Sequence, residues 1–235
     1  MSAAMVGALA GTSVGASLGS TGGAPTVAEN FPASNPCANS GDGRGDPALD
    51  LKKNRWTAPA QSDMAPSITA PANMIGLPEP SAVKSIKLRA NWPDVAAVQQ
   101  LDSLENHAVT VVGYLVGAKE EDVGDGESCN CHEPKVLFDY HLYLAGKPGV
   151  PIAQAAVVEM TPRWRAAYPS WGTAENGFSG FATIKSHMNE QVRVTGWLLF
   201  DEEHLDQVGR YRATVWEIHP ITTFEYEKGG SWVTL

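Results

Sequence analysis

The chain contains no long hydrophobic run and has a deficit of positive charge. None of its apolar stretches approaches the roughly 18 residues that a membrane-spanning helix requires. Its 17 Lys and Arg residues are outnumbered by 26 Asp and Glu residues, which gives a formal net charge of −9. Because general binding to a phosphate backbone needs a basic surface, we expect a soluble protein with no membrane partner and no strong, general nucleic-acid binding.

Cysteine is also scarce, with only Cys37, Cys129 and Cys131. The sequence C-N-C-H at 129–132 is one residue shorter than the C-x-x-C-H of covalent haem attachment, which argues against haem as a cofactor. Structural zinc sites usually need a second cysteine pair, and only Cys37 remains. We favour a disulfide between Cys37 and Cys129 or Cys131, which requires an oxidising compartment. A Cys129–Cys131 bridge, a metal site and free thiols are the alternatives.

The N-terminal third lacks a basic start and a periodic apolar face. Residues 1–23 contain no Lys or Arg, so they are either a shortened remnant of a secretory signal or a flexible arm. Residues 24–80 are rich in Pro, Gly, Ser, Asn and Asp, a composition that buries too little apolar surface to fold alone. We therefore divide the chain into a low-complexity arm or linker, 1–83, and a folded domain, 84–235. The arm is expected to dock on a neighbouring subunit, and the protein to be extracytoplasmic or secreted.

The folded part consists mainly of β-branched and aromatic runs that predict strands. A spacing of three between apolar residues indicates a helix at 93–104, and Thr161 followed by Pro162 is typical of a helix start. Strands are predicted at 109–116, 136–144, 153–160, 191–200 and 210–226, and helices at 93–104, from Thr161 to before Pro169, and at 181–188.

An internal repeat relates two of these strands. V-T-V-V-G-Y-L-V at 109–116 matches V-R-V-T-G-W-L-L at 192–199, with Gly113 in the position of Gly196. Each copy leads through an acidic turn to a strand that carries an acid-x-His sequence. Two similar hairpins separated by a strand and a helix give the order β-β-β-α-β-β, which is that of the OB-fold, whose bent strands need such glycines. The sequence therefore predicts a mainly β, five-stranded OB-like barrel with a long irregular N-terminal arm.

Six local motifs support this fold by resemblance. They are G-[YW]-L, E-S-C-N-C-H, D-Y-H-L-Y-L, V-V-E-M-T-P-R, G-W-L-L-F-D-E-E-H and W-E-I-H-P. With them, residues 84–226 resemble a little-characterised group of bacterial OB-like domains, and the resemblance implies the fold and candidate positions but no activity. The topology is also similar to that of staphylococcal-type nucleases, which cut nucleic acid with carboxylates, arginine and calcium. Their catalytic motif does not align with this chain, so that likeness is one of fold alone.

Two strands repeat an acid-x-His pattern, D-Y-H at 139–141 and E-I-H at 217–219. Because side chains alternate along a strand, each acid shares a face with its own histidine, and Trp216 takes the opposite face. Imidazole and carboxylate together suit zinc, manganese or iron, and also general acid–base chemistry near neutral pH. We therefore take Asp139, His141, Glu217 and His219 as candidate catalytic residues, with His141 and His219 as candidate ligands of a divalent metal.

Glu159, His204 and Arg212 are candidate ligand-binding residues. Arg212 lies an odd number of residues from Glu217, so strict alternation places it on the opposite strand face unless a bulge intervenes. The structural alternative is that His141 and His219 only hydrogen-bond to carboxylates across the sheet and hold the barrel together.

Two classes of function remain open. The acidic balance and the Gly/Ala-rich arm favour a non-catalytic, extracytoplasmic OB-like recognition or assembly module, in which the arm docks on a neighbour or forms a homo-oligomer. The alternative, favoured by the repeated acid-x-His pattern, is a metal-assisted hydrolase of phosphodiesters or another anionic substrate. The sequence does not decide between an enzyme and a binding module.

Overall fold

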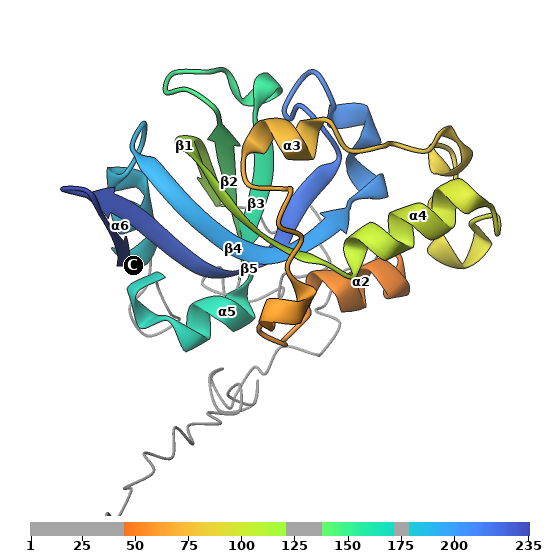
Figure 1. The fold of residues 1–235 in the computed structure, drawn as a ribbon, viewed down its shortest axis with the longest axis horizontal. Helices are drawn as coiled ribbons and strands as arrows, with labels where there is room; N and C mark the ends of the chain where they lie inside the picture. The colour runs from red at the N-terminus through yellow and green to blue at the C-terminus, as the bar shows by residue number, and fades with distance from the viewer. Residues whose placement is uncertain (1–44, 121–137, 172–178) are drawn as a thin grey trace, which may run out of the picture.

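The computed structural model describes residues 45–120, 138–171 and 179–235, which fold around a closed β-barrel (Figure 1). Five strands form the barrel, and a sixth, short strand extends the sheet beyond β5. The strands are β1 (Ala108–Glu120), β2 (Tyr140–Ala145), β3 (Ala156–Met160), β4 (Gln191–Phe200), β5 (Trp216–Lys228) and β6 (Ser231–Thr234).

The strand order is β3-β2-β1-β4-β5-β6, and a parallel pairing between β3 and β5 closes the barrel. β1 is the long strand that pairs antiparallel with both β2 and β4. This connectivity is that of an OB-like barrel, so the predicted fold class is confirmed; β6 is an addition to it. β4 has the predicted bounds, whereas β5 begins at Trp216 rather than at 210 because the preceding residues form turns.

One of the two repeated glycines lies at an irregular point of the barrel. The pairing of β4 with β5 shifts register on both sides of Gly196, where a Cβ atom would lie 2.4 Å from the carbonyl oxygen of Pro220. In β1 the register shift falls between Leu115 and Gly117, slightly beyond Gly113. Gly113 instead allows the close approach of Pro71, whose Cγ would lie 2.8 Å from an added Cβ.

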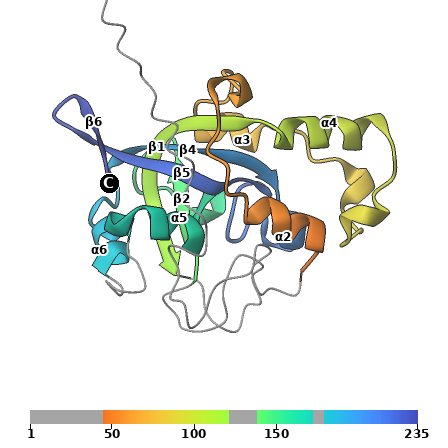
Figure 2. The same cartoon turned by 90° about the horizontal axis from the view of Figure 1, so that it is seen from below.

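The predicted helical region between β3 and β4 covers one end of the barrel (Figure 2). It contains α5 (Pro162–Ala167), the 3-10 turn η6 (Pro169–Trp171) and α6 (Ser179–Ser186). The side chain of Thr161 accepts a hydrogen bond from the Trp164 amide at the start of α5, as expected of an N-cap. Phe181 of α6 packs on Tyr140, with 4.7 Å between ring centroids, which connects this region to the barrel core.

Residues 45–107 lie against the barrel as short helical segments joined by irregular stretches. They comprise α2 (Pro47–Lys53), η1 (Gln61–Asp63), α3 (Pro71–Ile75), η2 (Ser81–Val83), η3 (Arg89–Asn91) and α4 (Ala96–Glu105). Two further short turns are η5 (Ile152–Gln154) and η7 (Glu202–Gln207). Leu49 and Met74 are fully buried, so this part of the predicted arm contributes to the packed structure. Residues 1–44 lie outside the described part of the chain.

The barrel interior is apolar. Leu142 of β2, Val158 of β3 and Ile218 of β5 belong to its core. Since side chains alternate along a strand, the neighbouring positions on these three strands point to the outer face of the barrel. Within 45–120, 138–171 and 179–235, no helix has both the length and the apolar character needed to cross a bilayer.

Candidate functional site

A row of three polar side chains crosses the outer face of β2, β3 and β5. In the antiparallel pairing of β2 with β3, His141 lies opposite Glu159. In the parallel pairing of β3 with β5, Val158 lies opposite Ile218, so the next residues, Glu159 and His219, are also neighbours. The register of the closed barrel thus places Glu159 between the two predicted acid-x-His strands.

The Glu159 carboxylate contacts an imidazole on each side. Its Oε1 is 3.0 Å from Nε2 of His141, and its Oε2 is 2.9 Å from Nδ1 of His219. Asp139 adds an oxygen 3.5 Å from His141 Nε2. None of these side chains is more than 5% exposed. Among the described residues, the close contact of His219 with Glu159 does not have hydrogen-bond geometry, and His219 Nε2 has no hydrogen-bond partner.

Together with Glu217, these side chains form two groups whose donor atoms are close enough to hold a metal ion. One contains Asp139, His141 and Glu159, and the other contains Glu159, Glu217 and His219. Within each set, one donor atom from each residue lies within 4.8 Å of the others. The two histidines belong to different sets, and Glu159 is shared by both.

Arg212 reaches this cluster from a turn rather than from a strand. It precedes β5 and forms an isolated bridge with Val208, so the alternation that assigned it to the opposite face of Glu217 does not apply. Its Nη1 is 3.4 Å from Oε1 of Glu217, and the residue is 1% exposed. Among the described residues, Arg212 Nε and Nη1 have no hydrogen-bond partner.

Two residues that the sequence did not single out belong to the same cluster. Asp201 follows β4 directly, and its Oδ2 is 2.9 Å from the fully buried Nζ of Lys53. His204 Nε2 lies 3.7 Å from the same oxygen, so His204 contacts the cluster through Asp201. Lys53 lies in the predicted arm, at the end of a helix that Asp46 caps and Pro47 begins. Those two residues are a recognisable helix signal, but they do not indicate where Lys53 points.

The ionisation of the carboxylates differs from residue to residue. Burial raises the pKa of Glu217 well above its usual range, and the neighbouring Glu159 carboxylate adds to this effect. Burial alone would also raise the pKa of Glu159, but His141 and His219 outweigh it and hold that pKa well below its usual range. For Asp201, burial is outweighed mainly by His204 and Lys53, so its pKa is also low. Burial and neighbouring charges therefore favour the protonated form of Glu217 and the ionised forms of Glu159 and Asp201.

Six of the seven predicted catalytic and ligand-binding residues thus lie in one buried cluster, the Glu159 cluster, together with Asp201 and Lys53. The six are Asp139, His141, Glu159, Arg212, Glu217 and His219. The seventh, His204, lies beside it. The predicted disulfide cannot be placed, because Cys37, Cys129 and Cys131 lie outside the described residues.

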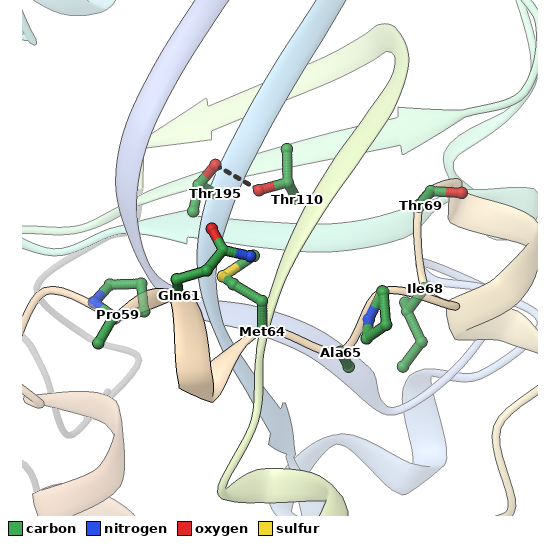
Figure 3. A pocket seen from close by; sticks show the side chains of 10 residues that line it. Pro59, Gln61, Met64, Ala65, Ile68, Thr69, Thr110 and Thr195 are labelled. Carbon is green, nitrogen blue, oxygen red and sulfur yellow. Dashed lines mark hydrogen bonds between the residues drawn. The ribbon is translucent and has the colours of Figure 1, made fainter.

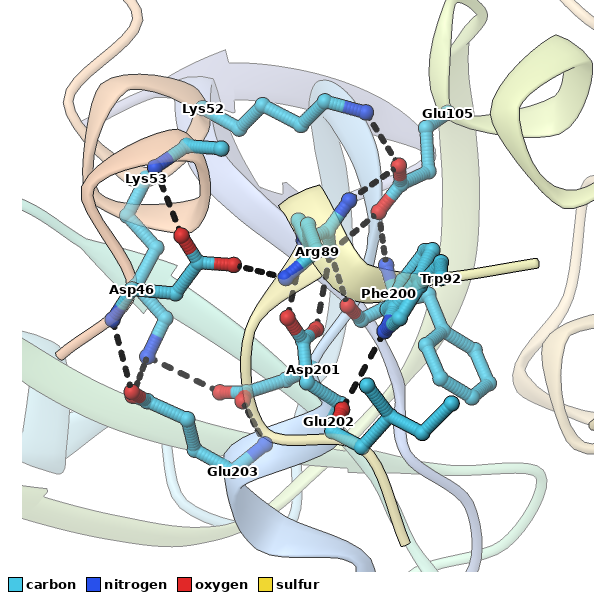
Figure 4. Close-up of polar contacts among 12 residues, drawn as sticks. Asp46, Lys52, Lys53, Arg89, Trp92, Glu105, Phe200, Asp201, Glu202 and Glu203 are labelled. Atoms are coloured by element: carbon cyan, nitrogen blue, oxygen red, sulfur yellow. Dashed lines mark hydrogen bonds and ion pairs between the residues drawn. The ribbon is translucent and has the colours of Figure 1, made fainter. Parts of the chain in front are cut away.

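A second charged network joins the segment before β1 to the end of β4 (Figure 4). The Arg89 guanidinium donates to both carboxylate oxygens of Glu105, at 2.6 and 2.8 Å, and to both of Glu202, at 2.9 Å each. It also lies 4.6 Å above the Trp92 ring. Every donor of this arginine points toward an acceptor of the protein, so we assign the network a structural role.

Two pockets of the described structure lie away from the cluster. One cavity, of about 430 Å³, forms where residues 59–69 cross β1 and β4, and Thr110 and Thr195 are hydrogen-bonded to each other at its wall (Figure 3). Another, of about 360 Å³, lies between residues 83–87 and η7. Neither is lined by a residue of the Glu159 cluster.

Comparison of the chain with protein-family models, with curated proteins and with solved structures gives no match.

Proposed function

We propose that this protein binds two divalent transition-metal ions on the outer face of β2, β3 and β5, with Glu159 as the ligand that bridges them. Asp139 and His141 complete the ligand set of one ion, and Glu217 and His219 that of the other. The observation that supports this most is the position of Glu159, whose two oxygens face two different imidazoles at 3.0 and 2.9 Å.

The spacing of the donor atoms fits a shared ion. Two atoms bound to the same zinc ion at normal bond lengths lie about 3 Å apart, which is also the separation of hydrogen-bonded atoms. The two arrangements differ in direction, because hydrogen-bonded atoms point at each other and co-ligands point at a common position. His219 Nδ1 and Glu159 Oε2 are 2.9 Å apart without hydrogen-bond geometry, which favours co-ligands. Nitrogen and carboxylate donors suit zinc, manganese or iron.

The chemistry of such a centre is hydrolytic. Each ion has three donors from the protein, which leaves a coordination position for water. A divalent ion, when bound, lowers the pKa of coordinated water toward neutrality and so supplies a nucleophile. Metal-assisted hydrolysis of an anionic substrate is therefore the reaction class that we propose for the site.

A non-catalytic recognition or assembly module is the second candidate function. It is favoured by the burial of the donors, because a pair of ions at this position could also serve only to hold three strands together. Docking through the N-terminal arm and an extracytoplasmic location remain predictions, since residues 1–44 and the three cysteines lie outside the described structure.

Metal analysis of the purified full-length protein tests the proposal. After purification without chelators and dialysis against zinc, manganese or iron(II), we expect about two ions per chain. Glu159→Gln should lose both ions, since it removes the shared carboxylate. The matched control is Glu190→Gln. Glu190 also contacts a histidine, since its Oε2 lies 2.7 Å from Nδ1 of His187, but its side chain is half exposed and lies outside the cluster. Wild-type protein that takes up no ion from any of the three solutions would contradict the proposal.

A further inference from the structure

We infer that Arg212 forms an oxyanion subsite of the metal centre and that its ligand is a phosphate dianion or the terminal phosphate of a small ester. This inference rests on the proposed metal site and adds the class of ligand that the site takes. Arginine suits this role, since its planar guanidinium matches the geometry of phosphate oxygens.

The first argument is the state of the Arg212 side chain. It is 1% exposed, and among the described residues its Nε and Nη1 donate no hydrogen bond. Buried donors without acceptors are unfavourable, because they have lost their hydrogen bonds to water. Arg89 provides the contrast within the same chain, since its donors are taken up by the carboxylates of Glu105 and Glu202. Arg212 therefore has donor capacity that a bound anion can use.

The second argument is position. Nη1 of Arg212 lies 3.4 Å from Oε1 of Glu217, which is a proposed ligand of one ion. An oxyanion bound at the open coordination position of that ion is thus within reach of the guanidinium. Metal ion and arginine together are a common combination for holding phosphoryl groups.

The third argument is charge. With neutral imidazoles, the centre contains four ionisable carboxylates and two cationic side chains: Asp139, Glu159, Asp201, Glu217, Lys53 and Arg212. Arg165 beside Asp139 and Glu203 beside Lys53 add one charge of each sign at the edge of this set and do not change its net charge. When all are ionised, four negative and two positive charges leave −2, and two divalent ions change this to +2. A buried excess of positive charge is costly unless it is compensated. A phosphate dianion compensates it fully, whereas a single carboxylate compensates half.

The fourth argument is size. All metal donors and Arg212 are at least 95% buried. Burial to this degree excludes the interior phosphodiester of a long polymer, so we take the ligand to be a small anion or the terminal group of a small ester. The acidic net charge of −9 agrees with a small ligand rather than a polyanion.

Calorimetric titration of metal-loaded full-length protein with inorganic phosphate tests the inference. A parallel titration with acetate tests whether a carboxylate binds instead. We expect phosphate to bind the metal-loaded protein more tightly than acetate does, and not to bind metal-free protein. Arg212→Gln should weaken phosphate binding by about tenfold or more, because it removes charged hydrogen bonds, while the metal content stays unchanged. Arg193→Gln is the control, because Arg193 pairs with Glu225 on the surface.

Arg212→Lys is the second variant, in case the glutamine variant does not fold. Lysine keeps the positive charge but lacks the planar guanidinium with its parallel N–H donors, so this variant should also bind phosphate more weakly. If either folded variant binds metal and keeps the phosphate affinity of wild type, the inference is overturned. It is also overturned if the metal-loaded wild-type protein binds no phosphate or prefers acetate. In each of these cases the proposed metal site itself stands. If no metal binds at all, the proposed function and this inference both fail.

Discussion

At the scale of single residues, the Glu159 cluster poses an energetic problem that its composition alone does not solve. Burying a charged group is costly unless it is paired with opposite charge and its hydrogen bonds are made. Glu159, Glu217 and His219 are all fully buried, and their polar atoms make close contacts without complete hydrogen bonding. Metal coordination satisfies such atoms more fully than the protein contacts do.

His219→Ala separates a metal ligand from a structural histidine. We expect it to lower the metal content from about two ions per chain to about one, because it removes a ligand of one ion. Its melting temperature in chelator should change little, since Ile218 and Trp216 pack on the opposite face. His107→Ala, at a half-buried histidine outside the cluster, is the control. The structural alternative predicts a lower melting temperature in chelator and no metal in either protein.

At the scale of elements, the pairing of β4 with β5 shifts register on both sides of Gly196, beside the part of β5 that carries His219 and Pro220. Gly196 makes this close pairing possible, because the backbone of β5 passes so near that no side chain fits between the two strands. A glycine inside a strand ordinarily weakens it, and here the close approach explains its use.

Gly196→Ala should therefore destabilise the barrel. The added Cβ would lie 2.4 Å from the Pro220 carbonyl oxygen and 2.7 Å from the Ile221 Cα, both of which are backbone atoms. We expect the free energy of unfolding to fall by about 3 kcal/mol, as for overpacking of a core, in a urea titration. Gly146→Ala is the matched control, since nothing lies within 4 Å of the position that its Cβ would take. Equal stability of the two variants would show that β4 does not need this close approach.

At the scale of the whole molecule, Arg89 joins three distant parts of the chain. It connects the segment before α4 to Glu105 at the end of that helix and to Glu202 after β4. Burial raises the pKa of Glu202 to about 7, since Arg89 offsets only part of the cost. Burial also opposes the ionisation of Glu105, but Arg89 and Lys52 outweigh it and lower that pKa.

Glu202 should make stability depend on pH in a definite direction. A carboxyl whose pKa is higher in the folded than in the unfolded protein holds its proton more tightly when folded. Its favourable contribution is therefore complete below the ordinary glutamate pKa and is lost as the pH rises through about 7. In the Glu202→Gln variant the glutamine side chain cannot ionise, so this contribution to the pH dependence of stability is absent. Between pH 5 and 8, we expect the variant to gain on the order of 2 kcal/mol of stability relative to wild type.

The measurement is the free energy of unfolding of both proteins in urea at several pH values. Asp206→Asn serves as the control, because Asp206 is an exposed carboxylate on the same short segment, η7. A constant difference between Glu202→Gln and wild type from pH 5 to 8 would refute the assignment.

The sequence by itself determined the five barrel strands in outline, their order along the chain and the face that Glu217 shares with His219. It did so through local patterns, which depend only on neighbours in the chain. These patterns are the alternation of side chains along a strand, the repeated sequence around Gly113 and Gly196, and the helix start at Thr161. They predicted the barrel, and they predicted that Glu217 and His219 share a face.

Only the tertiary structure decided which side chains meet. The register of β3 between β2 and β5 places Glu159 between two histidines, and a one-residue shift of that register would turn its carboxylate into the apolar core. Lys53 reaches Asp201 from a segment whose composition resembles a linker, and Arg212 reaches Glu217 from a turn to which strand alternation does not apply. The contacts of Glu159 with His219 and of Lys53 with Asp201 join residues far apart in the chain, and they form only in the folded barrel, which no local pattern encodes.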